Sequence, residues 1–310
     1  MMEVLVTPRS FGKENPDLFL RLERAGLTVS RNTTGAVLDE SAMIRLIGPC
    51  SGIIVGIDPL GKKVLDAAPN LRAISKYGVG LDNIDLAECE RRGIRVSRTV
   101  GANSNAVADY AFALMLAVAR RVVLIDRRCR RRDFAKLTSL DVHGKTLGII
   151  GLGAIGKCVA RRAAGFGMRV LACDEVWDAE FAASHDIVAA DVDRIAAECD
   201  FISLHCNLTA GTRHIINAKR LAMMKNTAVL VNTARGGLID EQALLESLEQ
   251  GRIWGAGLDV FECEPPQDPR WYALDNVVLG SHCSASTRGA VELMGSMAVD
   301  NLLADLGLGQ

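Results

Sequence analysis

The sequence lacks the features that mark several large classes of protein. Its 310 residues carry 36 Lys and Arg against 37 Asp and Glu, so no excess positive charge is available to hold a phosphate backbone, and we expect no nucleic-acid partner. Stretches without a charged residue, such as Thr146–Gly156 with 11 residues, reach 12 residues at most, short of the ~18 that a membrane span needs. Residues 1–7 show no cationic start followed by an apolar run, as a signal peptide would. These absences predict a cytoplasmic protein without a membrane partner.

Cysteine and histidine are present, but not in the spacings of a disulfide framework or a metal site. Nine Cys, an odd number, are scattered from Cys50 to Cys283 without a Cys-x-x-Cys pair, and there are only five His. This usage is typical of free thiols in a reducing compartment. We therefore expect neither disulfides nor a bound metal ion.

Short apolar runs rich in β-branched residues recur along the chain with helical stretches between them. Runs buried on both faces and separated by helices predict parallel sheets covered by helices. About ten such runs in 310 residues indicate two α/β sheets rather than one. The predicted strands are Val4–Thr7, Ile53–Val55, Ala73–Ser75, Arg95–Ser97, Thr146–Ile150, Arg169–Cys173, Phe201–His205, Val229–Asn232, Ala256–Asp259 and Val277–Leu279.

Residues 106–120 form an Ala- and Leu-rich segment without Gly or Pro. This composition predicts a long helix. Because its surface is mostly apolar, the helix requires burial, either between two domains or against a second subunit.

A glycine-rich turn follows the predicted strand Thr146–Ile150. Residues 151–156 read Gly-Leu-Gly-Ala-Ile-Gly and lead into a predicted helix. The motif alone is weak evidence, but a strand–turn–helix context is what dinucleotide binding requires. The first glycine permits the tight turn, the second lets a pyrophosphate approach, and the third lets helix and strand pack. The helix N-terminus then presents N–H groups to an anion. The cofactor residues predicted here are Gly151, Gly153, Ala154, Ile155 and Gly156.

Asp174 ends the next predicted strand, 23 residues after the first glycine of the turn. That is the place of the carboxylate that accepts hydrogen bonds from the adenosine ribose. Glu175 and Asp178 follow, with no Lys or Arg between residues 175 and 178. A 2′-phosphate would meet negative charge there, so the sequence predicts NAD rather than NADP as the cofactor.

Three downstream segments, at residues 229–240, 257–266 and 279–287, supply the groups that hydride transfer to a ketone needs. An Arg, Arg235, comes just after the predicted strand Val229–Asn232, where sites in open α/β sheets lie. A cation binds and polarises an oxo acid, an acid protonates the new alkoxide, and a further group orients that acid. Arg binds carboxylates bidentately, His titrates near neutrality, and Glu can orient and charge a His.

The order and combination of these motifs resemble the D-isomer specific 2-hydroxyacid dehydrogenase family, especially its D-3-phosphoglycerate dehydrogenase branch. The resemblance covers roughly residues 50 to 290. The matching stretches are Tyr77–Asp85, Gly101–Asp109, Gly151–Gly156, Asn232–Asp240, Asp259–Pro265 and His282–Thr287.

The resemblance implies an NAD-dependent enzyme that interconverts a D-2-hydroxy acid and its 2-oxo acid, with a catalytic trio of Arg235, Glu264 and His282. It implies two Rossmann- or flavodoxin-like domains: a split substrate domain of residues 1–100 and 284–310, and an NAD domain of residues 101–283. It also implies a homodimer through the helix at 106–120. The cofactor residues that it adds are Cys206, Thr212, Thr233, Ala234, Asp259 and Ser284, and the residues that it places at the substrate, besides Arg235, are Lys76, Tyr77, Gly78, Val79 and Asn103.

Two alternatives for the acid–base pair remain open in the sequence. Glu262 is as good a solitary acid as Glu264, and His205 ends a strand beside the cofactor. Other functions on this fold also compete. Formate dehydrogenases pair the His with Gln, which Glu264 argues against, whereas NAD-sensing corepressors keep the trio.

Departures from the family pattern bear on the substrate. Phosphoglycerate-specific relatives commonly place an Arg after the strand ending at Val55, whereas residues 56–59 here read Gly-Ile-Asp-Pro. Lys76 is the remaining nearby cation, so the pattern argues against 3-phosphoglycerate and leaves hydroxypyruvate, glyoxylate and bulkier oxo acids open. Ser281 replaces the Pro usual before the catalytic His, and residues 283–285 read Cys-Ser-Ala where a Gly is common.

Overall fold

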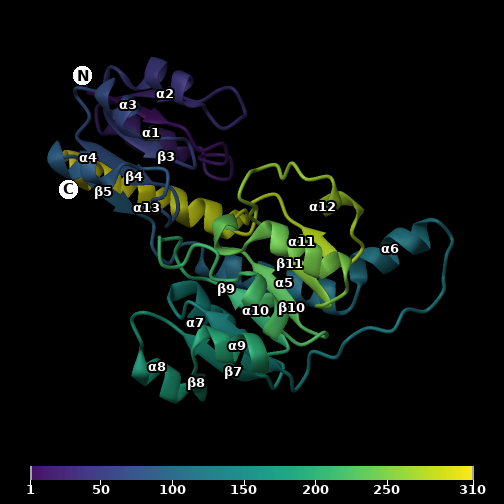
Figure 1. Ribbon diagram of the computed structural model, residues 1–310. Coiled ribbons are helices and arrows are strands. Elements are labelled where there is room, and N and C mark those ends of the chain that lie inside the picture. Colours follow the sequence, from purple (N-terminus) through teal and green to yellow (C-terminus); the bar gives the residue numbers. More distant parts are fainter. Residues whose placement is uncertain (1, 309–310) are drawn as a thin grey trace. The chain divides into compact units, whose positions relative to one another are not determined.

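A computed structural model describes residues 2–308 and divides them into two compact units (Figure 1). The first unit contains residues 2–103 and 285–308, and the second contains residues 104–284. The chain therefore leaves the first unit, completes the second, and returns. The second unit is thus inserted into the first.

The first unit is built on a parallel sheet of five strands in the order β2-β1-β3-β4-β5. This is the flavodoxin-like order. Helix α13 lies against β3, β4 and β5, so the end of the chain completes the core of the unit. Its elements are β1 (Met2–Val6), α1 (Asp17–Arg24), β2 (Leu27–Arg31), α2 (Glu40–Ile47), β3 (Cys50–Val55), α3 (Lys62–Asp66), β4 (Ala73–Lys76), α4 (Leu86–Arg91), β5 (Arg95–Arg98) and α13 (Arg288–Leu306).

The second unit is built on a parallel sheet of seven strands in the order β12-β11-β10-β9-β6-β7-β8. The chain reverses its direction of travel between β6 and β9, as in a Rossmann sheet. Its strands are β6 (Thr146–Ile150), β7 (Arg169–Cys173), β8 (Ile187–Ala189), β9 (Phe201–Leu204), β10 (Val229–Asn232), β11 (Gly255–Leu258) and β12 (Val277–Leu279). Its helices are α5 (Ser104–Ala119), α6 (Val122–Arg130), α7 (Ala154–Gly165), α8 (Ala179–Ser184), α9 (Val192–Glu198), α10 (Ala218–Met223), the 3₁₀ turn η1 (Gly236–Leu238), α11 (Glu241–Glu249) and α12 (Arg270–Ala273).

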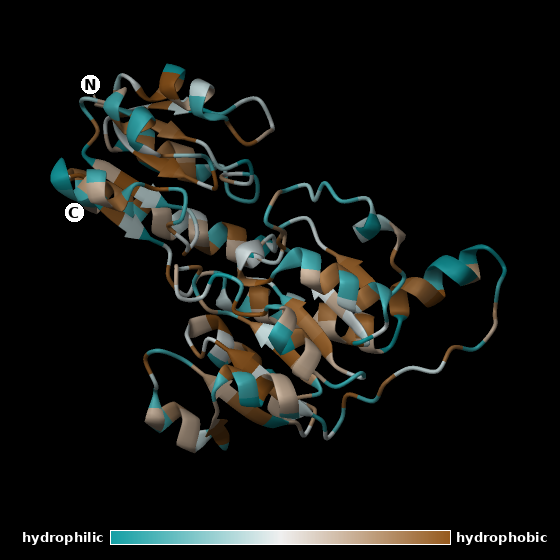
Figure 2. Ribbon diagram, in the orientation of Figure 1, coloured by the Kyte–Doolittle hydropathy of each residue, from teal (hydrophilic) through white to brown (hydrophobic). Residues whose placement is uncertain are grey.

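The two units each contain a parallel sheet with helices, and the second unit is inserted into the chain of the first. This arrangement confirms the predicted fold class. Each of the ten predicted strands overlaps an observed strand, but β2 and β8 are missing from the prediction. Both are edge strands, and each buries only its first residue. The inner strands β9, β10 and β11 are buried at every residue, and the sheets are the brown interior of each unit in Figure 2. Exposure to water weakens the apolar pattern of an edge strand, although the edge strands β5 and β12 were predicted.

The long helix predicted at 106–120 is α5, and most of its residues are buried. It packs against β10, β11, β12 and α7 of its own unit. The Cβ positions of Gly255 and Gly257 show how closely it approaches, since a methyl group at either would lie 2.8 Å from the Val118 or Leu114 side chain. Burial on its own sheet therefore accounts for the apolar composition of α5.

Candidate active site

The glycine-rich turn has the geometry that a dinucleotide requires. Gly151 has a φ of +99°, and a Cβ there would lie 2.4 Å from the Cys206 amide nitrogen. A Cβ on Gly156 would lie 2.0 Å from the Gly151 carbonyl oxygen. At Gly153, in contrast, a Cβ would meet nothing within 4 Å, and no side chain caps the helix that begins there. The turn thus combines closeness to the sheet with open space at a helix N-terminus, which fits an anionic pyrophosphate.

Asp174 follows β7 beside this turn, as the sequence predicts. Its two carboxylate oxygens accept the backbone N–H groups of Leu152, at 2.6 Å, and Val176, at 2.9 Å. Each oxygen keeps a second lone pair, which suits a ribose hydroxyl. The carboxylate therefore ties the glycine turn to the end of β7 and has acceptor capacity to spare.

The structure corrects the prediction that Asp178 adds negative charge against a 2′-phosphate. Asp178 does not stand as an unpaired negative charge, because it accepts the Phe181 N–H at the start of α8 and forms an ion pair with Lys157 at 2.5 Å. The hydrogen bond from Lys157 holds the pKa of the Asp178 carboxyl below its ordinary value. Lys157 lies in α7, outside residues 175–178. The case against a 2′-phosphate therefore rests on Asp174 and Glu175.

A buried asparagine shapes the end of β10. The Asn232 side chain accepts the Ala234 N–H at 3.0 Å and donates to the Arg235 carbonyl at 2.9 Å. The Thr233 hydroxyl is buried without a partner within residues 2–308, which leaves it available to a ligand. Gly236 then lets η1 approach the next loop, since a Cβ there would lie 1.9 Å from the Phe261 carbonyl carbon. These contacts set the position of Arg235, whose guanidinium donates to the Ala234 carbonyl at 2.7 Å.

Glu264 and His282 meet as the sequence predicts. The Nδ1 atom of His282 lies 2.9 Å from the Glu264 Oε2 atom, and both side chains are about one third exposed. The other carboxylate oxygen accepts the Phe261 N–H at 3.2 Å. Burial alone would raise the pKa of Glu264, but the hydrogen bond and charge of His282, that N–H and the charge of Arg235 together lower it. Glu264 is therefore a carboxylate at neutral pH, within the electrostatic reach of Arg235.

Asp259 follows β11 and holds the backbone around His282. It is completely buried, and its carbonyl accepts the His282 N–H at 2.8 Å. Its carboxylate accepts the N–H groups of Cys283, at 3.0 Å, and Ser284, at 2.8 Å. Three consecutive backbone donors thus converge on one residue, which fixes the turn that carries the imidazole.

The structure separates the two alternative acid–base residues from this pair. Glu262 accepts from His214, at 2.6 Å, and from Arg213, at 3.5 Å, and no contact joins it to His282 among the described residues. Burial lowers the pKa of His205 to about 3. His205 is therefore neutral at physiological pH and bonds to the Ser203 hydroxyl at 2.8 Å. Neither residue is placed to serve the role that Glu264 and His282 share.

Two further predicted cofactor residues lie after β9. Burial raises the pKa of the Cys206 thiol to about 12, and its backbone nitrogen adjoins Gly151. Thr212 is part of an exposed turn in which its hydroxyl donates to the Asn207 carbonyl at 2.6 Å and accepts the Thr209 N–H at 2.8 Å. Cys206 is thus part of the glycine-turn neighbourhood, whereas Thr212 is occupied in shaping its own loop.

The other predicted substrate residues lie in the first unit, at and after the end of β4. Lys76 is buried, and its ammonium donates to the Gly56 carbonyl and, at 2.7 Å, to Asn83. Tyr77 donates to the Val291 carbonyl at 3.1 Å, and burial raises the pKa of its phenol. Gly78 has a φ of +134° and donates its N–H to Thr99 at 2.9 Å.

Two features complete the account of the first unit. Val79 is half-buried, and the side-chain Oδ1 atom of Asn103 is buried without a partner within residues 2–308. Asp58, in the segment that lacks the Arg of phosphoglycerate-specific relatives, is internal. It accepts from the Leu38 N–H at 2.8 Å and from Thr7 at 2.5 Å.

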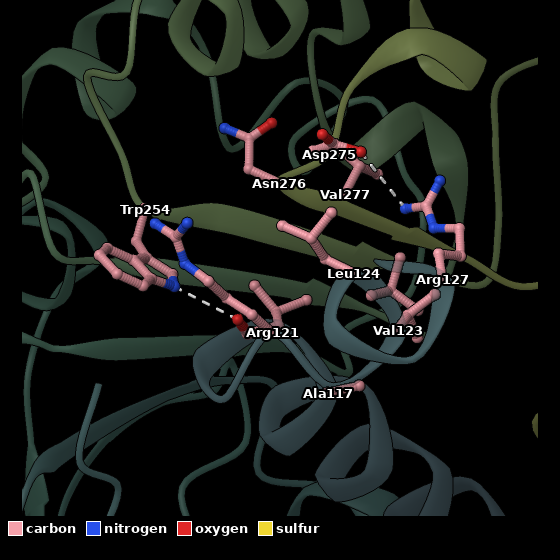
Figure 3. A pocket seen from close by; sticks show the side chains of 11 residues that line it. Ala117, Arg121, Val123, Leu124, Arg127, Trp254, Asp275, Asn276 and Val277 are labelled. Atoms are coloured by element: carbon pink, nitrogen blue, oxygen red, sulfur yellow. Dashed lines mark hydrogen bonds and ion pairs between the residues drawn. The ribbon is translucent and has the colours of Figure 1, made fainter. Parts of the chain in front are cut away.

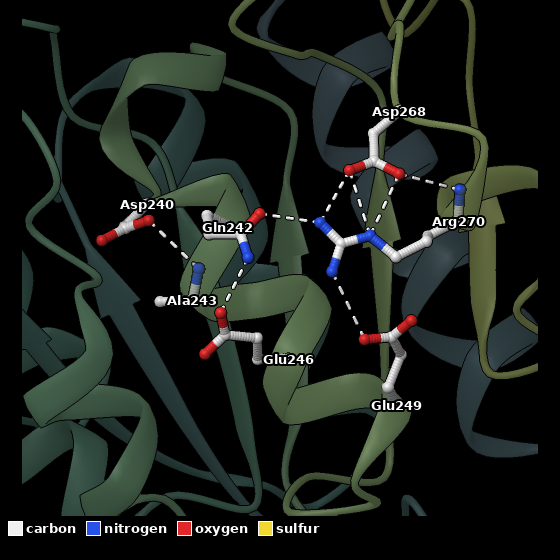
Figure 4. A network of polar contacts seen from close by, with 7 residues as sticks. All are labelled: Asp240, Gln242, Ala243, Glu246, Glu249, Asp268 and Arg270. Carbon is white, nitrogen blue, oxygen red and sulfur yellow. Dashed lines mark hydrogen bonds and ion pairs between the residues drawn. The ribbon is translucent and has the colours of Figure 1, made fainter.

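A polar network supports the segment that follows Glu264. Arg270 donates to Asp268 at 2.7 Å and to Gln242 of α11 at 2.7 Å, with Glu249 3.4 Å away (Figure 4). Because α11 begins at the Asp240 cap just after η1, the network joins the loop of Glu264 to the element that follows Arg235.

Some positions that shape the site were missed by the sequence analysis. The sequence patterns predicted no role for Asn232, Lys157, Tyr110 or Cys283. A buried Asn at a strand end was a signal that could have been used. No group of His, Cys, Asp or Glu within residues 2–308 is arranged to hold a metal ion. The described chain also contains no helix with the length and hydropathy of a membrane span.

Comparison with known proteins places these features in a family. Residues 112–284 match the model of the D-isomer specific 2-hydroxyacid dehydrogenase NAD-binding domain. The chain is 42% identical to a glyoxylate reductase of Korarchaeum cryptofilum over 86% of this chain and 82% of that one. It is 40% identical to a hydroxypyruvate reductase of Thermotoga maritima over 89% and 91% of the two chains.

A solved structure gives the same result over nearly the whole length. The D-lactate dehydrogenase from Aquifex aeolicus, complexed with NAD and lactic acid, superposes with a TM-score of 0.85 at 30% identity, covering 98% of this chain and 97% of that one. The glycine turn and Asp174 fit the same cofactor. The chain therefore belongs to the D-isomer specific 2-hydroxyacid dehydrogenase family, and it is an NAD-dependent oxidoreductase.

Proposed function

We propose that the protein reduces short, unphosphorylated 2-oxo acids, glyoxylate and hydroxypyruvate above all, to 2-hydroxy acids with NADH. The observation that carries the proposal is the contact of 2.9 Å between Nδ1 of His282 and Oε2 of Glu264. The charge of Arg235 also acts on this carboxylate and helps to lower its pKa. A proton donor, its orienting carboxylate and a substrate-binding cation thus meet at the ends of three neighbouring strands. That combination provides the groups that carbonyl reduction needs.

In this proposal Arg235 binds the substrate carboxylate and polarises the reacting carbonyl. Its planar guanidinium can donate two parallel hydrogen bonds to a carboxylate, which fixes the orientation of a small substrate. NAD in its reduced form supplies the hydride that reaches the carbonyl carbon. The negative charge that develops on the carbonyl oxygen is then stabilised by the neighbouring cations.

His282 donates the proton that this oxygen needs. The Nδ1 atom faces Glu264, so Nε2 is the nitrogen available to the substrate. The carboxylate holds the ring in one orientation through its contact with Nδ1. In reduction the imidazolium gives its proton from Nε2 and becomes neutral; in oxidation the neutral ring takes the proton from the hydroxyl.

The substrate assignment rests on the first unit and on the relatives. Residues 56–59 contain no Arg, and Lys76 is buried with donors committed to Gly56 and Asn83. This arrangement favours a small acid over a substrate carrying a phosphate. The relatives of Korarchaeum and Thermotoga bear the names glyoxylate and hydroxypyruvate reductase, which supports the same choice over the phosphoglycerate-like interpretation. The proposal therefore makes the unit of residues 2–103 and 285–308 the substrate domain.

A homodimer in a reducing cytoplasm is also part of the proposal. All nine cysteines are free thiols. Helix α6 (Figure 1) buries none of its residues. In the segment after it, Phe134 is 77% exposed. A hollow beside α6 is lined by Val123 and Leu124 of this helix and by Trp254 (Figure 3). Exposed apolar surface of this kind suits a second copy, so α6 and its neighbourhood are a better dimer surface than α5.

The test is NADH oxidation against glyoxylate, hydroxypyruvate and 3-phosphohydroxypyruvate, with NADPH as the cofactor control. We expect turnover of the first two acids, with kcat/KM for the phosphorylated acid lower by about tenfold or more, the loss of one charged contact. A preference for 3-phosphohydroxypyruvate would overturn the substrate assignment. Binding of NADH without turnover of any 2-oxo acid would overturn the enzymatic proposal in favour of an NAD sensor.

A further inference from the structure

The backbone at His282 has an unusual conformation that its surroundings must impose. Its φ is +55°, in the left-handed region that residues with a side chain rarely adopt. Such conformations persist where several contacts define them together, and they cluster at functional sites. The family pattern usually supplies a Pro before this His and a Gly soon after it, and this chain has Ser281, Cys283 and Ser284 instead. The local sequence therefore does not stiffen the turn, and other groups must hold it.

Two side chains of the second unit, Tyr110 and Cys283, meet beneath this turn. The Cys283 thiol donates to the Tyr110 hydroxyl at 3.3 Å, and its sulfur lies 3.6 Å from the Asp259 Oδ1 atom. Tyr110 comes from α5, which is packed on the sheet. Gly280 makes the approach possible, since a Cβ there would lie 2.9 Å from the phenol oxygen and 2.3 Å from Oδ1 of Asp259.

The arrangement connects α5 to the imidazole through short steps. Asp259 receives the N–H groups of residues 282, 283 and 284. The thiol of Cys283 contacts both this carboxylate and the phenol of Tyr110. A displaced Cys283 would release one of the backbone donors that hold His282 in the left-handed conformation. The ring would then leave the orientation in which Nδ1 faces Glu264.

We propose that Tyr110 and Cys283 are positioning residues for proton transfer, which with Asp259 hold the backbone of His282 and so fix the place of its imidazole. The inference rests on the proposed function, because it concerns the step in which His282 gives its proton. It assigns to a helix of the scaffold and to the residue after His282 the stiffening that Pro gives in the family pattern.

The first test uses Tyr110→Phe and Cys283→Ala in the full-length protein, with glyoxylate and NADH as substrates. We expect kcat to fall about five- to tenfold, which corresponds to the loss of one hydrogen bond that aligns His282. The NADH dissociation constant should stay within about twofold, because the glycine turn and Asp174 are untouched. The solvent deuterium isotope effect on kcat should rise as proton transfer limits the rate. Cys283→Ser, which keeps a donor, should retain more activity than Cys283→Ala.

Cys129→Ala is the matched control, because this half-buried thiol lies in α6, outside the network. It should leave kcat and the isotope effect unchanged. If Tyr110→Phe and Cys283→Ala only lower the melting temperature, with wild-type kcat and isotope effect, their role is structural and the inference is overturned.

A double-mutant cycle separates this inference from the proposed function. Tyr110→Phe added to His282→Ala should cost no further activity, because there is no ring left to position. The same fold loss in both backgrounds would overturn the positioning role. If His282→Ala alone keeps near-wild-type kcat, the proposed function falls and this inference with it; if His282→Ala is crippled while Tyr110→Phe and Cys283→Ala are normal, only this inference falls.

Discussion

The glycine turn and the acid–base cluster lie in the same unit and are built on opposite principles. The turn at residues 151–156 works through the absence of side chains: a methyl group at Gly151 or Gly156 would collide with backbone 2.0–2.4 Å away. The cluster works through side chains that come from three loops, at Arg235, Glu264 and His282. The turn is therefore encoded within six residues, whereas the cluster exists only after strands far apart in the sequence have been paired.

This difference predicts how each region fails. Damage to the turn should change cofactor affinity and stability together, because the same backbone contacts serve both. Damage to the cluster should change the rate of chemistry with little effect on NADH binding. The substitutions below test that separation, beginning with the largest expected effect.

His282→Ala should lower kcat for glyoxylate reduction by about 10²–10⁴-fold, the usual contribution of a positioned acid–base group. The NADH dissociation constant, measured by fluorescence titration, should change little. A matched substitution of the neutral His205, His205→Asn, should cost far less. A loss in the His205 variant as large as that in the His282 variant would move the acid to His205.

Arg235→Lys keeps the charge but loses the planar pair of donors. We expect kcat/KM for glyoxylate to fall about 10- to 100-fold, with a higher KM and a lower kcat, since the contact serves both binding and carbonyl polarisation. Steady-state kinetics measures both parameters. Near-wild-type values would move the carboxylate anchor elsewhere, with Lys76 the first residue to examine.

Gly156→Ala should weaken NADH binding by about tenfold and destabilise the fold by about 1–3 kcal/mol, as expected when a packed site is overfilled. The added Cβ would lie 2.0 Å from the Gly151 carbonyl oxygen. Gly165→Ala is the matched control in the same helix, where a Cβ would meet nothing within 4 Å. Thermal unfolding with and without NADH measures both effects. Equal behaviour of the two variants would refute the role assigned to close packing at the turn.

NADH should be preferred to NADPH by about tenfold, or 1.4 kcal/mol, because Asp174 and Glu175 stand where a 2′-phosphate would lie. Asp174→Ala should narrow the preference, and Asp178→Ala, which frees Lys157 from its ion pair, should narrow it as well. The ratio of kcat/KM for the two cofactors measures this. Equal efficiency of the wild-type protein with both cofactors would contradict the assignment.

The same contrast explains how much the sequence could predict. The inner strands, the glycine turn and Asp174 were predictable because burial on two faces and backbone sterics leave local patterns. The edge strands β2 and β8 were not, because half-exposed residues blur the apolar run. Glu262 and Glu264 are indistinguishable locally, and only the folded loop shows that one faces His214 and the other His282.

Contacts across long sequence separations account for the rest. The resemblance implies that Asp259 contacts the cofactor, but it gives no sign that the carboxylate also accepts backbone donors 24 and 25 residues away. The ion pair of Asp178 with Lys157 spans 21 residues, and the positive charge of Lys157 offsets the negative charge of Asp178. Neither contact has a local signature, so no pattern in the neighbouring residues could have predicted it.

The proposed reduction requires Glu264 to hold His282 in the orientation from which Nε2 can donate a proton. Because the pKa of Glu264 lies below its ordinary value of 4.5, its carboxylate is charged throughout the neutral range and loses that charge only as the pH falls through the lowered pKa. Glu264→Gln keeps a hydrogen-bond acceptor and removes the charge. Its cost at neutral pH should be the smallest of the set.

The most direct test is the pH dependence of kcat/KM for Glu264→Gln and the wild-type protein, with glyoxylate and NADH for reduction and glycolate and NAD for oxidation. In both directions we expect kcat/KM of the wild-type protein to decline as the pH falls through the lowered pKa of Glu264, because protonation removes the charge of the carboxylate beside His282. The variant has no titrating group at this position, so its profile should lack that decline. Superimposable profiles for the two proteins would contradict the claim that the charge of this carboxylate supports catalysis.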